Sequence, residues 1–256
     1  MKKNFDITTS IVLYKEDLNE LSRTIDCFLK TRLKKKLFLI DNTPTKEFEG
    51  VFNQKEIEYI PVEKNIGFGP GHNLVLSKIK NQSNYHLILN PDVFFNPFVI
   101  PNLIAKLDRH EVVSMIAPKV LFPNGEFQNS CRRYPKIIEL LARRFTFLAP
   151  LVPATLRKGN YSDINLETSF FADYITGCFH LYKTEDFVEL NGFDERYFLY
   201  MEDVDICRKI EKLDKKKLYY PKEEITHVLK QGSLKQKKLF FHHIFSVIKF
   251  FLKWSF

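Results

Sequence analysis

Acidic residues stand at two places in the sequence where a carboxylate can bind a metal or accept a proton. Asp92 ends the largely apolar run 85–92, and a carboxylate in such surroundings costs free energy unless a cation or hydrogen-bond donors compensate it. Mg²⁺ typically takes one or two protein carboxylates and completes its shell with phosphate oxygens and water. We therefore interpret Asp92 as a candidate ligand for a metal that carries a diphosphate, with Asn90 as a weaker supporting ligand.

The second place is Glu202-Asp203-Val204-Asp205, which follows the aromatic-rich segment 193–200. Three acids at the start of a helix can simply cap it and interact with its dipole. That role does not explain why they follow aromatic residues, where partial desolvation would raise a carboxylate pKa toward that of a useful general base. The segment is therefore a candidate for proton transfer as well as for capping.

A glycine-rich segment at 65–73 follows one expected strand and opens a helix. Glycines at such a place let backbone N–H groups approach an anion. The spacing matches neither the P-loop nor the dinucleotide fingerprint, so a plain glycine-rich turn is the alternative. The candidate ligand-binding residues in it are Asn65, Gly67, Phe68, Gly69 and Asn73.

Basic residues in the second half of the chain are suited to phosphate oxygens. His227 follows a short strand-like stretch and is itself followed by Lys230 and Ser233; a single histidine in such a place is more often structural than a ligand. Arg132 and Arg133 form a basic pair, which either lies in a solvated loop or faces an anionic donor or acceptor.

These residues must be positioned by strands and helices, and the apolar periodicity predicts an α/β fold. Short β-branched runs alternate with apolar residues at helical spacing, which implies right-handed βαβ crossovers and a mainly parallel sheet covered on both faces. The expected strands are 7–13, 37–40, 57–62, 87–89 and 112–117, and the expected helices are 18–29, 74–79 and 97–107. Ligands gather at the carboxyl ends of such strands, which adds Tyr14 and Asp41 to the candidates.

The second half of the sequence is less regular. Pro123-Asn124-Gly125 predicts a hairpin turn, and the polar stretch 160–169 predicts a mobile loop. After this loop we expect an apolar stretch at 174–182, a short helix near 185–190, a helix after Glu202 and a short strand at 217–220.

The last segment, residues 234–256, is expected to form an amphipathic helix. Its polar strip is Lys235, Lys238, His242, Ser246, Lys249 and Lys253, and its apolar residues include Leu239, Phe241, Ile244, Phe245, Ile248, Phe251, Leu252 and Trp254. This pattern is typical of a helix that lies on a membrane surface, and the ~20 consecutive apolar residues of a span are not present. The alternatives are packing on the rest of the chain or a dimer contact.

The composition is that of one main folded domain with anionic partners. A chain of 256 residues with 45% hydrophobic content can build a sizeable core. The net charge of +8 suits nucleotide diphosphates, lipid phosphates or nucleic acid. The four cysteines are widely spread, which indicates neither a zinc site nor a disulfide framework, and the N-terminus lacks a secretory pattern, so we expect a cytoplasmic location.

Taken together, residues 7–233 resemble glycosyltransferase family 2, in the branch that includes bacterial rhamnosyltransferases. The most specific stretches of this resemblance are 174–182 and 191–209. The resemblance implies a GT-A fold, which is Rossmann-like, over residues 1–233. Its nucleotide-binding half would cover about 1–118 and its acceptor-binding half 119–233, with the helical segment 234–256 appended.

The resemblance also implies roles for single residues. Tyr14, Asp41 and the 65–73 segment would hold the nucleoside, and Asp203 would be the catalytic base. Asn90-Pro91-Asp92 stands where the family has Asp-x-Asp, so Asp92 would bind Mg²⁺ or Mn²⁺, with His227 as a second metal or diphosphate contact. Gly177 and Arg132 would lie near the sugar and acceptor, and the remaining acceptor or diphosphate candidates are Arg133, Glu202 and Lys230.

The implied activity is inverting transfer of a sugar from a nucleoside-diphosphate donor, dTDP-rhamnose ahead of a UDP-hexose. The acceptor would be a glycan or a polyprenyl-diphosphate-linked glycan in bacterial surface-polysaccharide synthesis. The enzyme would reach it from the inner face of the cell membrane, and a homodimer is one alternative for its oligomeric state.

Two rival functions are weighed. A nucleotidyltransferase would need a glycine-rich basic triphosphate loop near the N-terminus. A nucleic-acid-binding protein would need basic residues and stacking aromatics on one strip, whereas acids cluster at the presumed site, so we expect no nucleic-acid partner.

Overall fold

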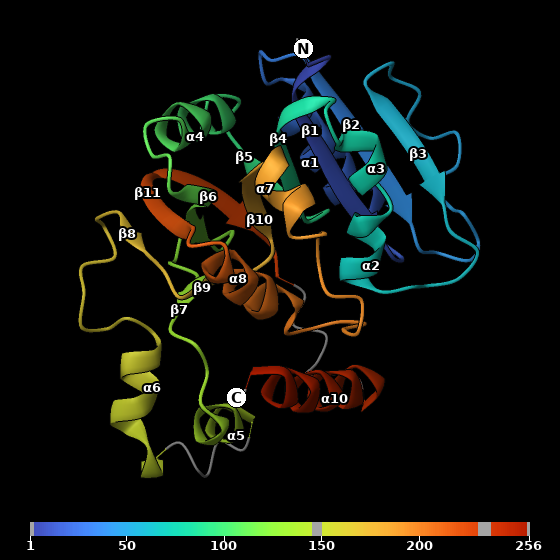
Figure 1. Cartoon of the computed structure of the whole chain (residues 1–256). Coiled ribbons are helices and arrows are strands. Elements are labelled where there is room, and N and C mark those ends of the chain that lie inside the picture. The colour runs from blue at the N-terminus through green and yellow to red at the C-terminus, as the bar shows by residue number, and fades with distance from the viewer. Residues whose placement is uncertain (1–2, 145–149, 230–236, 255–256) are drawn as a thin grey trace.

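A single mixed β-sheet with helices on both of its faces organises the chain (Figure 1). The structure is a computed structural model that describes residues 3–144, 150–229 and 237–254. The main sheet has nine strands in the order β3-β2-β1-β4-β10-β6-β11-β5, with β8 paired to β11. The expected α/β class is therefore confirmed.

The first half of the chain supplies parallel strands. These are β1 (Phe5–Leu13), β2 (Lys35–Asp41), β3 (Ile57–Pro61) and β4 (Ser83–Leu89). Helix α1 (Leu18–Leu29) begins after Asp17, whose carboxylate accepts hydrogen bonds from the backbone N–H groups of Asn19 and Glu20 and so caps the first turn. The parallel alignment brings the carboxyl ends of β1, β2 and β4 to one edge, as the sequence predicts.

Strands from later in the chain complete the same sheet and make it more mixed than expected. Antiparallel β10 (Phe179–Lys183) lies between β4 and β6 (Val113–Leu121). Next to β6 runs the parallel strand β11 (Lys216–His227), which pairs antiparallel with β5 (Val93–Phe95) and β8 (Phe170–Phe171). The strand expected at 217–220 is longer than predicted, because a register shift between Tyr220 and Glu224 lets it continue to His227.

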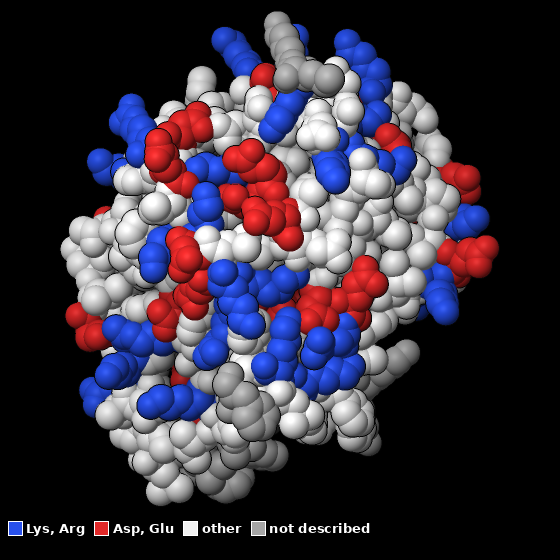
Figure 2. Space-filling view, viewed as in Figure 1, with Lys and Arg blue, Asp and Glu red and all other residues white. Residues whose placement is uncertain are grey.

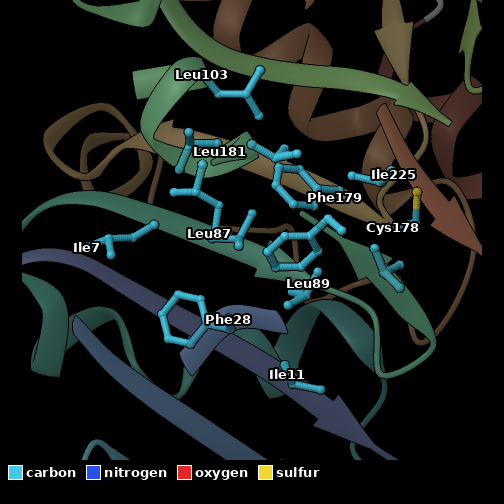
Figure 3. Close-up of a cluster of buried hydrophobic side chains, with 14 of the residues drawn as sticks. Ile7, Ile11, Phe28, Leu87, Leu89, Leu103, Cys178, Phe179, Leu181 and Ile225 are labelled. Atoms are coloured by element: carbon cyan, nitrogen blue, oxygen red, sulfur yellow. The ribbon is translucent and has the colours of Figure 1, made fainter. Parts of the chain in front are cut away.

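Alternate residues of the central strands face two separate hydrophobic cores. Leu87 and Leu89 of β4 belong to the first core and Ile88 belongs to the second, as the two-residue period of a strand requires. The first core (Figure 3) packs against α1 and α4 (Val99–Leu107). The second packs against α3 (Leu76–Ile79), α7 (Thr184–Glu189) and α8 (Glu202–Lys212). Coverage of both faces is thereby confirmed.

Several smaller elements surround this frame. The turn expected at Pro123-Asn124-Gly125 is present, since the Phe122 N–H donates to the Glu126 carbonyl at 2.8 Å. A two-stranded ribbon joins β7 (Cys131–Arg132) to β9 (Tyr174–Ile175). Helices α2 (Phe68–Asn73), α5 (Ile137–Arg144) and α6 (Pro153–Gly159) were not foreseen, and α10 (Lys237–Trp254) forms in the predicted C-terminal segment. None of the helices described here has the length and hydrophobicity needed to traverse a bilayer.

Candidate active site

Two consecutive strained residues set the direction of the acidic segment. Tyr200 and Met201 both adopt left-handed backbone conformations, with φ of 70° and 68°, and α8 begins at the next residue, Glu202. A left-handed conformation costs a residue with a side chain roughly 1–2 kcal/mol. Such strain is held only where the surroundings fix it, and it clusters at functional sites. Here it turns the chain abruptly into the helix that carries Asp203.

Glu202 and Asp203 occupy different surroundings although they are neighbours. The Glu202 side chain is buried, and its Oε2 atom has no hydrogen-bond partner among the described residues. Asp203 is only partly buried; its Oδ1 accepts from the Val204 N–H at 2.8 Å and its Oδ2 from the Gly177 N–H at 3.3 Å. Asp203 is therefore the acid of this pair that a ligand can reach.

Burial also shifts the acidity of both groups. It raises the pKa of Glu202 to about 8, and the charge of Asp203 adds to the effect. Burial raises the pKa of Asp203 too, against the hydrogen bonds from Val204 and Gly177 and the positive charge of Arg132. A partly exposed carboxylate with a raised pKa has the properties of a general base.

The two predicted arginines have different partners. Arg133 makes an ion pair with Asp163 at 2.7 Å and stacks on Tyr161, with 4.5 Å between the guanidinium and the ring centre. The positive charge of Arg132 lowers the pKa of Asp203. The buried Nε of Arg132 has no hydrogen-bond partner within the described ranges. The structure therefore leaves Arg132 available to a ligand and uses Arg133 to hold its own loop.

Asp92 and His227 lie at the ends of β4 and β11 and face each other. The His227 Nε2 is 3.4 Å from the Asp92 Oδ1 and 3.4 Å from the Asn90 Nδ2. On the other side of the ring, Nδ1 and the Gln128 Oε1 are 2.7 Å apart. Burial disfavours the charged imidazole, but nearby Cys178 and Asp92 outweigh it and raise the pKa of His227 to about 10.

This pair fits a divalent cation. With Nδ1–H donating to Gln128, Nε2 could coordinate a cation once the cation displaces its proton, and such outer hydrogen bonds commonly orient metal-binding histidines. No cluster of three or more acidic, histidine or cysteine ligands occurs in the part of the chain that the structure describes. A metal here would therefore take two protein ligands and complete its shell with phosphate oxygens and water, as Mg²⁺ does.

Gly177 and Cys178 connect this pair to the base. Gly177 donates to Asp203, while the next carbonyl, that of Cys178, accepts from the Asn90 N–H at 2.9 Å. A Cβ atom at Gly177 would lie 3.4 Å from the Asp203 Cβ and 3.7 Å from the Phe68 ring. The predicted residues Gly177, Phe68, Asn90, Asp92 and Asp203 are thus brought into one neighbourhood.

The glycine-rich segment 65–73 packs against residues 193–198, which precede the left-handed pair Tyr200 and Met201. Gly67 has φ of 102°, and a Cβ atom there would lie 2.3 Å from the Phe198 carbonyl oxygen. The Phe68 N–H donates to that same carbonyl at 3.0 Å, and the Asn65 side chain accepts from the Gly67 N–H. A Cβ at Gly69 would be 2.8 Å from that of Phe193. The glycines here permit close approach between two protein segments.

Two predicted nucleoside contacts are already occupied by protein partners. Asn73 holds the backbone N–H and carbonyl of Phe193 and contacts Glu195. The fully buried Asp41 carboxylate accepts from the Thr43 N–H at 2.8 Å and the Tyr59 hydroxyl at 2.7 Å. Tyr14, in contrast, is 44% exposed.

The sequence analysis missed Gln128 and did not foresee the partners of Asp205, and one further candidate lies outside the described residues. Gln128 orients His227, and Asp205 receives donors from the C-terminal helix. Asp205 was visible only as the third acid of its motif, and no local pattern marks Gln128. The candidate Lys230 and the neighbouring Ser233 lie outside the described residues.

The chain is similar in sequence to two bacterial proteins named as rhamnosyltransferases. The chain is 26% identical over 197 residues to the N-acetylglucosaminyl-diphospho-decaprenol L-rhamnosyltransferase of Mycobacterium tuberculosis (strain CDC 1551 / Oshkosh), covering 73% of this chain and 62% of the relative. It is 26% identical over 172 residues to the rhamnosyltransferase WbbL of Escherichia coli (strain K12), covering 63% and 60%. The chain thus spans about three fifths of the length of these relatives.

Solved structures share the fold. GalNAc-T7, solved with UDP, GalNAc and Mn²⁺, superposes with a TM-score of 0.65 at 17% identity and covers 87% of this chain and 43% of its own. Staphylococcus aureus TarS, residues 1–349, superposes with a TM-score of 0.55 at 13% identity and covers 84% and 60%. Residues 9–190, from β1 to the end of α7, match the family described as glycosyl transferase family 2. On this match over most of its length, the chain belongs to glycosyl transferase family 2.

Proposed function

We propose that this chain is an inverting glycosyltransferase with Asp203 as its general base. The observation that carries the proposal is the partly exposed Asp203 carboxylate, which has a raised pKa and is linked through Gly177 and Cys178 to the Asp92–His227 pair. A proton acceptor next to a cation-binding pair is what a direct displacement on a sugar diphosphate requires.

In this reaction Asp203 accepts the proton of an acceptor hydroxyl while the hydroxyl oxygen attacks the anomeric carbon. The bond to the diphosphate oxygen breaks on the opposite side, the electron pair leaves with the diphosphate, and the configuration inverts. Arg132, whose buried Nε has no hydrogen-bond partner within the described part of the chain, binds an anionic group of donor or acceptor. Mg²⁺ or Mn²⁺, held by Asp92 and His227 when bound, would supply charge neutralisation at the leaving group.

The proposed substrates rest on the relatives and on the composition. Two relatives are named as rhamnosyltransferases, and one of them acts on an N-acetylglucosaminyl-diphospho-decaprenol. By analogy we assign this chain a dTDP-rhamnose donor, with a UDP-hexose second, and a polyprenyl-diphosphate-linked glycan acceptor in surface-polysaccharide synthesis. The net charge of +8 suits both diphosphates.

A donor screen with stereochemical analysis tests this function. Nucleotide sugars are offered with Mn²⁺ to the intact chain, and transfer to a short-chain lipid diphosphate glycan is followed by mass spectrometry and by NMR of the anomeric proton. We expect one donor to be used, with inversion and with loss of turnover in excess chelator. Retention of configuration would rule out a single displacement. Full activity in chelator would show that no metal neutralises the leaving diphosphate and would assign that role to Arg132.

Helix α10 supports a peripheral place for the enzyme on the inner face of the membrane. Its exposed residues include Phe241, Phe245, Ile248 and Leu252, which are 56%, 58%, 49% and 70% exposed. They recur at intervals of three or four and so form one apolar ridge. Figure 2 shows Lys and Arg side chains gathered where Figure 1 draws α8 and α10. An apolar ridge beside cations is typical of interfacial helices.

Liposome flotation tests this location. We expect the intact chain to float with anionic vesicles and the double variant Phe245→Gln, Leu252→Gln to remain in solution, with both retaining the same melting temperature. Equal behaviour of the two chains, together with a concentration-dependent dimer in light scattering, would assign the ridge to self-association instead.

A further inference from the structure

The polar strip of α10 faces inward, onto the segment that precedes the catalytic acids. The Ser246 hydroxyl donates to the Leu199 carbonyl at 2.9 Å, and the Lys249 ammonium donates to the Arg196 carbonyl at 2.6 Å. His242 stacks on Phe198 with 4.4 Å between ring centres. Three residues of the helix therefore fix three positions of one loop, and the ridge proposed to meet the membrane points away from it.

Helix α10 also contacts Asp205, inside α8. Asp205 is fully buried and accepts hydrogen bonds from Lys253 at 2.8 Å, Trp254 Nε1 at 2.7 Å and the Tyr197 hydroxyl at 3.1 Å. Lys253 also pairs with Asp194 at 2.6 Å. A buried carboxylate that loses a hydrogen-bonded cation is strongly destabilised where it stands, so Lys253 stabilises the Asp205 carboxylate in this position.

The loop held by α10 touches the active site on its other side. The Phe198 carbonyl, next to the Leu199 carbonyl bound by Ser246, accepts from the Phe68 N–H at 3.0 Å. Two residues later come the left-handed pair and then Glu202 and Asp203. Any shift of this loop or of the first turn of α8 therefore moves the Asp203 carboxylate relative to Gly177.

We infer that α10 is a positioning element of the active site, and that Lys253, acting through Asp205, is a positioning residue for Asp203. The inference rests on the proposed role of Asp203 as the base. It assigns a function to the third acid of the Glu202-Asp203-Val204-Asp205 motif: Asp205 is the docking point by which the C-terminal helix holds the start of α8.

Single-turnover transfer by the full chain tests this inference, with a soluble acceptor analogue so that membrane binding plays no part. We expect Lys253→Met to lower the rate of transfer by about 10–100-fold, since an error of about 1 Å in placing a reacting group costs that much. Donor affinity should change less than the rate, because the nucleoside candidate Asp41 is held by Thr43 and Tyr59, outside the loop that α10 holds. Lys253→Arg, which restores the cation, should recover most of the rate.

The matched control is Lys80→Met, which removes an exposed lysine after α3 and should leave transfer unchanged. A normal rate in Lys253→Met, alongside an inactive Asp203→Asn, overturns the positioning role while leaving the proposed function intact. An active Asp203→Asn overturns the proposed base first. If Lys253→Met does not fold, Ser246→Ala decides, because it removes a loop contact without exposing a buried charge: a reduced rate supports the inference and an unchanged rate overturns it.

Discussion

Asp92 and Asp203 are both aspartates near the carboxyl edge of the sheet, and their neighbours give them opposite properties. Asp92 lies 3.4 Å from an imidazole that Gln128 orients from behind. Asp203 stands beside a second carboxylate, Glu202, whose pKa is raised to about 8. Burial raises the pKa of Asp203, which suits a group that takes up protons, whereas the contact of Asp92 with His227 suits the binding of a cation. On the roles proposed above, the same residue type would serve coordination in one place and proton transfer in the other.

The largest effect should come from removing the proton acceptor. Asp203→Asn keeps the shape of the side chain but only one of its two hydrogen bonds from the Val204 and Gly177 N–H groups, because an amide has a single accepting oxygen, and it cannot take the acceptor proton. General-base assistance is typically worth about 10²–10⁴-fold, so single-turnover transfer should fall by about that factor. Donor affinity, measured by calorimetry, should be nearly unchanged. A variant with a transfer rate within a few fold of the native chain would contradict the assignment of Asp203 as the general base.

Changing the other aspartate should act through the metal. Asp92→Asn should lower transfer by roughly 10²-fold, in the range typical of lost electrostatic stabilisation, and should raise the Mn²⁺ concentration needed for half activity. Gln128→Leu, which touches only the rear of His227, should weaken metal affinity by about tenfold. Activity measured at increasing Mn²⁺ concentration tests both variants. Identical curves for the native chain, Asp92→Asn and Gln128→Leu would show that Asp92 and His227 do not bind the metal.

The smallest effect should appear in the dependence of stability on pH. Because the pKa of Glu202 is raised from 4.5 to about 8, the folded state binds a proton that the unfolded state releases above pH 4.5. The contribution of Glu202 to stability is therefore full below about pH 4.5 and is lost as pH rises through 8. Urea unfolding between pH 5 and pH 8.5 should show a smaller decline in Glu202→Gln than in the native chain, and parallel declines would contradict the raised pKa.

Much of the fold could be predicted because its signals are local. The alternation of β-branched runs with helical periodicity locates β1 to β4, α1 and α4 within a few residues of their observed ends. The short ribbons and the antiparallel course of β10 could not be predicted in the same way, because their partners are distant in sequence. His180 of β10, for example, is paired with Ile88.

In the candidate site, too, residues with a local signal in the sequence could be predicted and residues whose partners are distant could not. Asp92, Asp203 and Gly177 were identified from residue type and motif, and the structure brings them together, though their roles remain predictions. Gln128 was missed because it meets His227 across 99 positions of sequence. The sequence pattern also could not predict which face of α10 points inward, since Lys253 pairs with Asp194 and Asp205, which are 59 and 48 positions away in the sequence.

The insertion of β10 between β4 and β6 has a consequence for the order in which the chain can fold as it is made. Residues 83–89 and 113–121 leave the ribosome long before residues 179–183, the strand that joins them. Until then one edge of β4 and both edges of β6 have open hydrogen-bonding groups, because β11 is made later still, a state that invites association with other chains. The two halves of the sequence therefore cannot mature one after the other, and the nascent chain must be kept from aggregating until its second half arrives.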